Sequence, residues 1–245
     1  TREYLCEPMD DMSSLFPTAI VNACKDPHLT LMDRRHDDDD SQYFIGWDPA
    51  ISSDKNADYT AMTIMRYLGD DDIKQIVHVV HEKGLGSHAQ RNMMLLLNNR
   101  FKPELIELEG NNFQRMFEAE LQDMKADIPI RTFMTTRTKK ETLFMSLLMA
   151  FEQGKIKLPY GDERSKQYTH KVEEELNRFG MQKNGRLESV GVNDDLAMSL
   201  ALANWGTKEF KGSVMLLDDI LPGFDDWMGG KDHRKSNYGS PWMIP

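Results

Sequence analysis

The stretch Tyr43-Phe44-Ile45-Gly46-Trp47-Asp48 decides the fold, because it joins a short apolar run to an acidic end. Pro49 follows directly and cannot extend a central strand, since it lacks the backbone N–H of the ladder. The run therefore predicts a buried β-strand that ends on a carboxylate. Two further β-rich runs, 58–67 and 73–81, are separated by Gly69-Asp70-Asp71-Asp72, which indicates a three-stranded antiparallel meander.

The rest of the chain alternates between helical and strand-like patterns. In chain order these patterns predict a helix over 87–101, a strand over 104–109, a helix over 113–125, a strand over 128–134, a helix over 140–153, a short strand over 156–159, and helices over 164–178 and 194–204. Asn184-Gly185 predicts a β-hairpin between residues 181 and 190. Together they predict an α/β fold in which helices cover both faces of a mixed five-stranded sheet, with a β-hairpin and extended termini.

Three parts are predicted along the chain. Residues 1–41 contain one helix candidate, at 16–23, and end in four adjacent acids that repel each other and stay solvated, which indicates a linker. Residues 42–206 carry the predicted sheet and helices and form the domain. Residues 207–245 are rich in Gly, Pro, Asp and Trp without a clear period, so we expect a C-terminal tail.

The composition is that of a globular protein, with 40% hydrophobic and 29% charged residues. No apolar run approaches the roughly 18 residues that span a bilayer, so no membrane partner is expected. Two cysteines are too few for a disulfide framework and indicate reduced thiols in a cytoplasmic compartment.

The net charge of −10 is unevenly distributed. Residues 131–186 contain twelve Lys or Arg and seven Asp or Glu, which gives this segment +5 and the remainder −15. A basic middle segment is compatible with a track for phosphate groups, which an acidic surface repels. The alternative is a set of ordinary solvated helix faces, and for any single residue this is the better interpretation.

Three acidic positions stand out because each lies where an apolar element begins or ends. Asp48 ends the first strand, Glu109 ends the fourth strand, and Asp194-Asp195 opens the last helix. An acid at the edge of a core is costly to desolvate unless a positive charge neutralises it. No Lys or Arg lies within two residues of any of them, and Mg²⁺ prefers carboxylate oxygens, so a divalent metal site is predicted.

Each acid also has a simpler explanation. Asp194 or Asp195 can serve the helix N-terminus, where an anion meets unpaired N–H groups, and on the local pattern alone this is favoured. Asp48 before a proline fits a turn, and Glu109 before Gly-Asn-Asn fits a strand end at the surface. The order of all three, on the first strand, the fourth strand and the final helix, favours the metal site.

The stretches that carry these acids resemble the nuclease domain of tailed-phage large terminases. They are Ile45-Gly46-Trp47-Asp48-Pro49-Ala50, Ile106-Glu107-Leu108-Glu109-Gly110-Asn111-Asn112 and Asn193-Asp194-Asp195-Leu196-Ala197-Met198-Ser199-Leu200-Ala201-Leu202-Ala203. The resemblance covers roughly residues 43–205. It implies a ribonuclease H-like fold related to Holliday-junction resolvases, and a nuclease that cuts concatemeric viral DNA in the bacterial host cytoplasm during genome packaging.

The resemblance also implies which acids hold metal. Asp48 matches the acid of the first strand, Glu109 that of the fourth strand, and one of Asp194 and Asp195 the last acid. Successive helical residues point about 100° apart, so one of the pair is expected to be the main ligand, with Asp195 the first choice and Asp194 the second. Two ions, Mg²⁺ or Mn²⁺, are expected roughly 4 Å apart around the scissile phosphate.

Further residues are expected to assist these ligands. Glu107 shares a strand face with Glu109 by the two-residue period and is a candidate for an outer helper, and Asp54 lies where related enzymes can carry an auxiliary acid. Double-stranded DNA is expected to meet the basic segment, with the contacts assigned to Lys183 and Arg186 at the hairpin tip and to Lys139 and Lys140.

The phosphate-binding loop of packaging ATPases, G-x-x-x-x-G-K-[ST], does not occur in the chain. We therefore expect an upstream ATPase domain, to which residues 1–41 would be the linker, and the resemblance adds the portal and the small terminase subunit as partners. A junction resolvase or transposase-like nuclease is the alternative within the fold. A non-catalytic portal-docking domain is the alternative of another class.

Overall fold

The computed structural model describes residues 14–50, 59–110, 128–181, 187–189 and 194–210. The chain divides into two units, residues 1–212 and 213–245, and all of the described residues belong to the first. Among these residues no helix is both long and apolar enough to cross a membrane. The predicted helix over 113–125 and the predicted tail over 207–245, apart from residues 207–210, lie outside the described part.

Seven described strands form one mixed sheet in the order β1-β7-β4-β3-β2-β5-β6. Their bounds are β1 Lys25–Asp26, β2 Gln42–Asp48, β3 Tyr59–Leu68, β4 Ile73–Lys83, β5 Leu105–Glu109, β6 Ile130–Phe133 and β7 Ile156–Pro159. The predicted α/β class is confirmed, but the predicted count of five strands is wrong. The two additional strands, β7 and β1, join the sheet beyond β4 through parallel pairing.

Strand β2 lies inside the sheet because its apolar run is buried on both faces. It pairs antiparallel with β3 and parallel with β5, and β4 completes the predicted meander. The carboxyl ends of β2, β4, β5 and β6 therefore meet the start of β3 at one end of the sheet. Asp48 is the last residue of β2 and faces Ala61 of β3.

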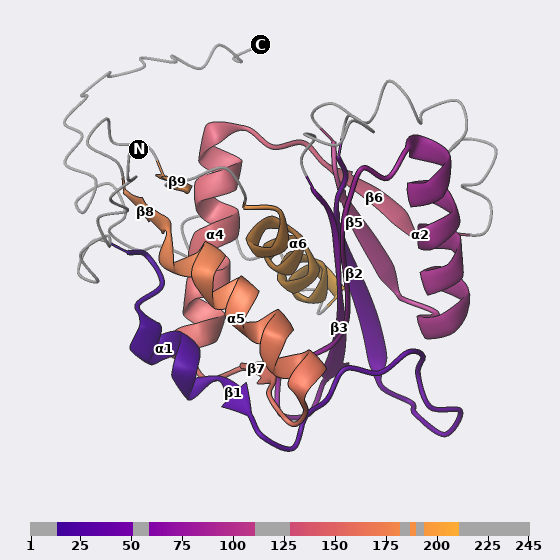
Figure 1. Cartoon of the computed structure of the whole chain (residues 1–245), viewed down its shortest axis with the longest axis horizontal. Helices are drawn as coiled ribbons and strands as arrows, with labels where there is room; N and C mark the ends of the chain where they lie inside the picture. The colour runs from indigo at the N-terminus through magenta and orange to yellow at the C-terminus, as the bar shows by residue number, and fades with distance from the viewer. Residues whose placement is uncertain (1–13, 51–58, 111–127, 182–186, 190–193, 211–245) are drawn as a thin grey trace, which may run out of the picture. The chain divides into compact units, whose positions relative to one another are not determined.

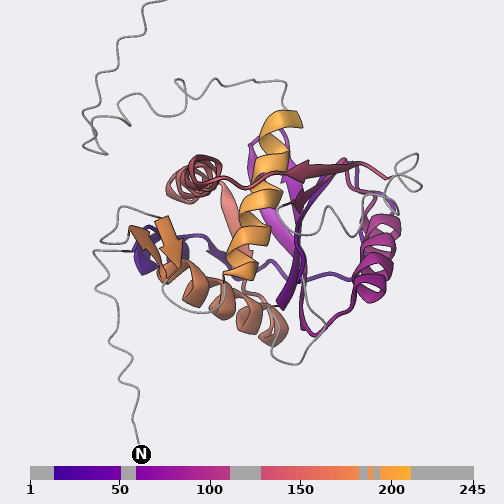
Figure 2. The same ribbon diagram turned by 90° about the horizontal axis from the view of Figure 1, so that it is seen from above.

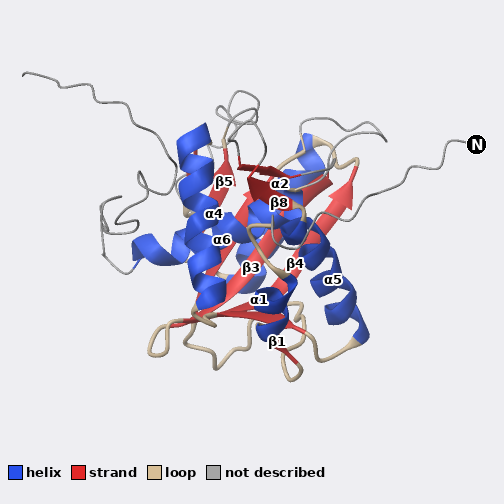
Figure 3. Ribbon diagram, turned by 90° about the vertical axis from the view of Figure 1, so that its left-hand side faces the viewer, coloured by secondary structure: helices blue, strands red, loops and turns tan. Residues whose placement is uncertain are grey.

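Helices cover both faces of the sheet, as predicted (Figure 1). Their bounds are α1 Thr18–Ala23, α2 Ser87–Phe101, α4 Arg137–Glu152, α5 Glu163–Asn177 and α6 Asp195–Phe210. Among the described helices, α2 packs on one face of the sheet, whereas α6 lies directly on the opposite face and α4 and α5 lie outside it (Figure 2). Seen from that side, α1, α4 and α5 lie in front of the sheet (Figure 3).

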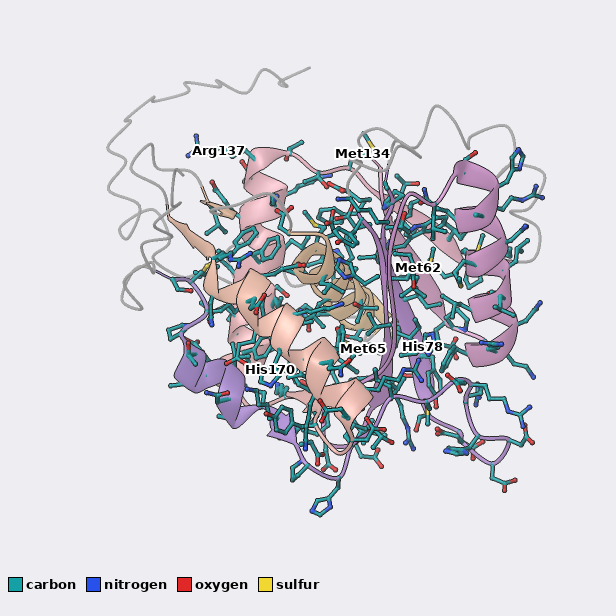
Figure 4. The ribbon with its side chains drawn as sticks, viewed as in Figure 1. Met62, Met65, His78, Met134, Arg137 and His170 are labelled. Atoms are coloured by element: carbon teal, nitrogen blue, oxygen red, sulfur yellow. The ribbon has the colours of Figure 1, made fainter. Side chains whose placement is uncertain are left out.

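The strand alternation divides the apolar side chains between two cores. Met65 belongs to the core under α4, α5 and α6, and Met62 to the core under α2, on the other side of the sheet (Figure 4). Helix α6 is buried over most of its first three turns, because Leu196, Leu200 and Ala203 pack inside the first core.

Part of the segment predicted as a linker packs onto this core. Phe16, Val21 and Cys24 are fully buried, and the ring of Phe16 meets those of Phe144 and Phe151 edge-on. These apolar residues extend the folded unit upstream of the boundary predicted at residue 42. Whether an ATPase domain precedes them stays a prediction.

The predicted hairpin is present as two short antiparallel strands, β8 Phe179–Met181 and β9 Leu187–Ser189, with Met181 opposite Leu187. It forms a separate two-stranded sheet. Its connection, residues 182–186, lies outside the described residues, and so do the predicted DNA contacts Lys183 and Arg186.

Candidate metal centre at the carboxyl end of strand β2

The acids predicted from the first and fourth strands lie side by side. Trp47 is in register with Leu108 in the parallel pairing of β2 and β5, so the next residues, Asp48 and Glu109, end their strands together. Phe133 of β6 continues the same row, since it is the register partner of Glu109. Glu109 is partly exposed, whereas Asp48 is only 8% exposed.

The third acid reaches Asp48 because α6 packs directly on β2 at a glycine. A Cβ atom at Gly46 would lie 1.9 Å from the Ser199 carbonyl oxygen and 2.4 Å from the Ala203 nitrogen. Only glycine leaves room for such close approach of a helix backbone to a strand. Gly46 lies two residues before Asp48 and thus on the same strand face, so this contact sets α6 over the acidic end of β2.

The electrostatics of Asp48 reflect how close these carboxylates lie to one another. The pKa of Asp48 is well above its usual value, first because of burial, then because of the charge of Glu109 and a hydrogen bond with its side chain, and then because of the charges of Asp195 and Asp194. Protonated Asp48 thus donates a hydrogen bond to the Glu109 carboxylate. The structure brings together the acids that the sequence singled out.

Asp194 and Asp195 have different surroundings. Asp194 precedes α6, its carbonyl oxygen accepts the Met198 N–H at 2.8 Å, and its side chain accepts a hydrogen bond from Lys140 Nζ at 2.9 Å. Asp195 is the first residue of α6 and is 9% exposed. Asp194 is therefore neutralised by Lys140, whereas Asp195 is the more buried of the two acids.

Glu107 also faces α6 but belongs to a different contact. It is the register partner of Gly46, is 1% exposed, and forms an ion pair with Arg131 of β6. A buried carboxylate that already has a guanidinium partner is stabilised in its charged form. Glu107 is thus held beside the acids rather than among the groups that raise the pKa of Asp48. Asp54, the predicted auxiliary acid, lies outside the described residues.

One acid of the site was missed from the sequence. Glu175 on α5 is 6% exposed, and its Oε2 accepts the Ala197 N–H at 3.0 Å, with a second backbone hydrogen bond from Leu196. It therefore caps the first turn of α6 from a neighbouring helix. Burial outweighs these hydrogen bonds and raises the pKa of Glu175 to about 7. Its helical spacing from Tyr168 and Val172 was the signal that could have found it, because those two residues are also buried.

The two predicted DNA contacts on α4 have different environments. Lys139 is exposed, whereas Lys140 lies over the rings of Phe144 and Phe179 while it holds Asp194. Those two rings are stacked with their centroids 3.9 Å apart. Lys140 therefore links α4, the base of the hairpin and the start of α6.

The chemistry of the acids fits a divalent cation. Among the described residues no three His, Cys, Asp or Glu side chains are arranged to hold one ion. Instead, the Asp48 and Glu109 carboxyl groups share a proton in a hydrogen bond. Two adjacent acids with a third nearby are expected to exchange that proton for a hard cation, whose charge offsets their repulsion.

Comparisons with known proteins identify the fold. No model of a known protein family matches the chain, and no relative is found among curated proteins. The large terminase nuclease from thermophilic phage G20c with bound magnesium is similar with a TM-score of 0.56 and 19% identity, over 79% of this chain and 97% of that one. The Thermus phage P74-26 large terminase nuclease domain gives 0.56 and 21%, over 78% and 93%.

A longer protein is similar in the same way. The HK97 bacteriophage large terminase matches with a TM-score of 0.53 and 9% identity, over 79% of this chain and 43% of that one. This chain therefore corresponds to less than half of that protein. At these identities the likeness concerns the arrangement of helices and strands, and the chain has the fold of the nuclease domains of phage large terminases.

Proposed function

We propose that the chain is a divalent-metal-dependent endodeoxyribonuclease of the ribonuclease H-like class, which cuts concatemeric viral DNA during genome packaging. The observation that carries this proposal is the meeting of Asp48, Glu109 and the start of α6 at one end of the sheet. A buried acid whose pKa is raised by neighbouring carboxylates is costly to a fold and is typical of functional sites. The fold shared with the G20c domain, which has been solved with bound magnesium, supports the same activity.

Each acid has a role in this proposal. Asp48, Glu109 and Asp195 hold two ions, Mg²⁺ or Mn²⁺, and Asp194 stays with Lys140. When bound, the ions supply a hydroxide nucleophile at neutral pH and stabilise charge on the leaving 3′ oxygen. As a ligand Asp48 would be deprotonated, and Glu109 would then no longer be its hydrogen-bond partner. Glu175 holds the first turn of α6, and so orients Asp195 toward Asp48.

The proposed partners follow from the same comparison. Double-stranded DNA is the substrate, and the backbone contacts that hold it carry no sequence information, so weak sequence preference is expected. An upstream packaging ATPase domain, the portal and the small terminase subunit complete the proposed assembly in the host cytoplasm. The chain's length relative to the HK97 large terminase supports a second domain.

Cleavage of supercoiled plasmid by the purified chain tests the proposal. We expect nicked and linear products with Mg²⁺ or Mn²⁺ and none with EDTA, and we expect no cleavage by Asp48→Asn with either ion. Asp70→Asn is a matched control, because Asp70 is exposed in the turn after β3, at the opposite end of the sheet. Cleavage that resists EDTA, or a fully active Asp48→Asn variant, would contradict the metal mechanism.

The same assay separates the alternatives. A strong preference for four-way junctions over linear duplex would favour a resolvase. Absence of cleavage with every divalent ion, from a chain that is folded by thermal unfolding, would favour a non-catalytic docking domain.

A further inference from the structure

The row of residues that contains Asp48 and Glu109 continues on the other side of β2. Asp48 is in register with Ala61 of β3, and Ala61 is in register with His81 of β4. Directly opposed residues on neighbouring strands point to the same face of a sheet. His81 therefore lies on the α6 side of the sheet, two strands from Asp48, which is roughly 10 Å at the usual strand spacing.

His81 is the centre of a small aromatic and basic cluster. The ring of Tyr59 stacks on the His81 ring with centroids 4.1 Å apart, and Lys83 Nζ lies 5.2 Å from the centroid of the Tyr59 ring. Lys171 of α5 approaches from the helical layer, close enough for its charge to act on His81. Two lysines from separate elements thus lie against the stacked pair of Tyr59 and His81, with Lys83 over the Tyr59 ring and Lys171 near His81.

The two lysines differ from the other cations near the acids. Lys140 is paired with Asp194, and Arg131 is paired with Glu107. Lys83 and Lys171 are both exposed, and within the described part of the chain neither forms an ion pair. Unpaired cations beside an acidic centre can bind an anionic ligand.

The His81 imidazole lies between these lysines and offers two ring nitrogens to a ligand. Burial, with a smaller contribution from the charge of Lys171, lowers the pKa of His81 to about 4, so the ring is neutral at pH 7. Neither ring nitrogen has a hydrogen-bond partner among the described residues. A buried polar group left without a partner beside a proposed active site is a candidate for contact with a ligand.

We propose that Lys83 and Lys171, with Tyr59 and His81 between them, bind phosphates of the DNA strand next to the metal centre. This inference rests on the proposed nuclease function and names the surface that holds its substrate. The distance from Asp48 is comparable to the rise of about three base pairs along the duplex axis, at 3.4 Å each. The bound phosphates therefore lie a few nucleotides from the scissile one.

DNA binding as a function of salt tests this surface. The probe is a short linear duplex with Ca²⁺ in place of Mg²⁺, and the variant is Lys83→Gln with Lys171→Gln. We expect binding to weaken about tenfold or more at moderate salt, and the log–log salt slope to fall by about two, one for each phosphate that the variant no longer binds. The change should be even across duplex sequences, because phosphate contacts do not read bases.

A control variant removes the same charge elsewhere. Arg100→Gln with Lys102→Gln changes two exposed residues at the end of α2, near the start of β2 and away from Asp48. We expect it to keep the wild-type slope, and equal melting temperatures of the two double variants would show that both are folded.

The outcomes distinguish the inference from the function on which it rests. If the wild-type chain cuts plasmid but Lys83→Gln with Lys171→Gln has the same log–log salt slope as the control variant, the inference is overturned and the proposed function is not. The inference is overturned in the same way if only Lys183→Gln with Arg186→Gln, in the hairpin, lowers the slope. A chain that neither binds nor cuts DNA overturns both.

Discussion

The carboxyl group of Asp48 is buried beside other acids, so its charged form is disfavoured until a cation is present. Its folded pKa lies above the unfolded value near 4, and the native state therefore loses stability as pH rises from that value through the folded pKa. We expect Asp48→Asn to raise the melting temperature at pH 7 with EDTA, because the amide has a similar shape and on folding neither takes up a proton nor repels the neighbouring carboxylates.

Thermal unfolding of wild type, Asp48→Asn and the exposed control Asp70→Asn measures this effect. Asp70→Asn is expected to unfold at the wild-type temperature. A lower melting temperature for Asp48→Asn than for the control would contradict the repulsion.

The acids that end apolar runs could be predicted from the sequence, because an apolar run that ends on a carboxylate is visible in the pattern of Phe44 to Asp48. The partners that tune them could not. Lys140 lies far along the chain from Asp194, and Arg131 reaches Glu107 only through the pairing of β5 with β6. Such partners depend on which strands and helices become neighbours, and a local pattern does not contain that information.

Among the elements, α6 depends on α5 for its cap. Glu175 accepts hydrogen bonds from the first turn of α6 in a buried position, so Glu175→Ala should destabilise the fold by about 1 to 2 kcal/mol. Glu175→Gln should lose less, because the amide oxygen can accept the same N–H groups.

The pH dependence of stability distinguishes the hydrogen bonds that Glu175 accepts from the effect of its charge. The folded pKa of Glu175 is about 7, above its unfolded value, so wild-type stability should fall as pH rises from about 4.5 to 7 and then level off. In Glu175→Gln this fall should be smaller. Urea unfolding at pH 5 and pH 7.5 measures it, and an unchanged pH difference in Glu175→Gln would show that the carboxyl group does not titrate in this range.

Most elements could be predicted because their periodic patterns of apolar residues extend over many positions. Helix α2 has the predicted bounds, and the meander is present. Strand β1 has two residues and exists through its pairing with β7, so no local pattern marks it. Helix α4 begins at Arg137, earlier than predicted, because the Thr136 side chain accepts the Lys139 N–H and caps a turn that has no apolar period.

At the scale of the whole molecule, ion binding should stabilise the fold in a pH-dependent way. An ion that binds only the native state raises the melting temperature, and binding to the Asp48–Glu109 pair displaces a proton. The increase with Mn²⁺ should therefore be larger at pH 8 than at pH 6, and it should vanish in Asp48→Asn. Ca²⁺ should also stabilise the fold without supporting cleavage, since its coordination is looser. If the increase in melting temperature with Mn²⁺ were the same at pH 6 and pH 8, ion binding would not displace the Asp48 proton.

The contact of α6 with Gly46 has a consequence for the timing of activity during synthesis. Asp48 and Glu109 are made early, whereas Asp195 opens the last described helix. Translation proceeds from the N-terminus, so a nascent chain carries Asp48 and Glu109 before it carries Asp195. Under the proposed function, a chain that stops before α6 lacks one of the three ligands and is expected not to cut DNA. The order of the elements thus makes α6 the last part of the proposed metal site to be synthesised, so that cutting is expected only after α6 has packed on β2.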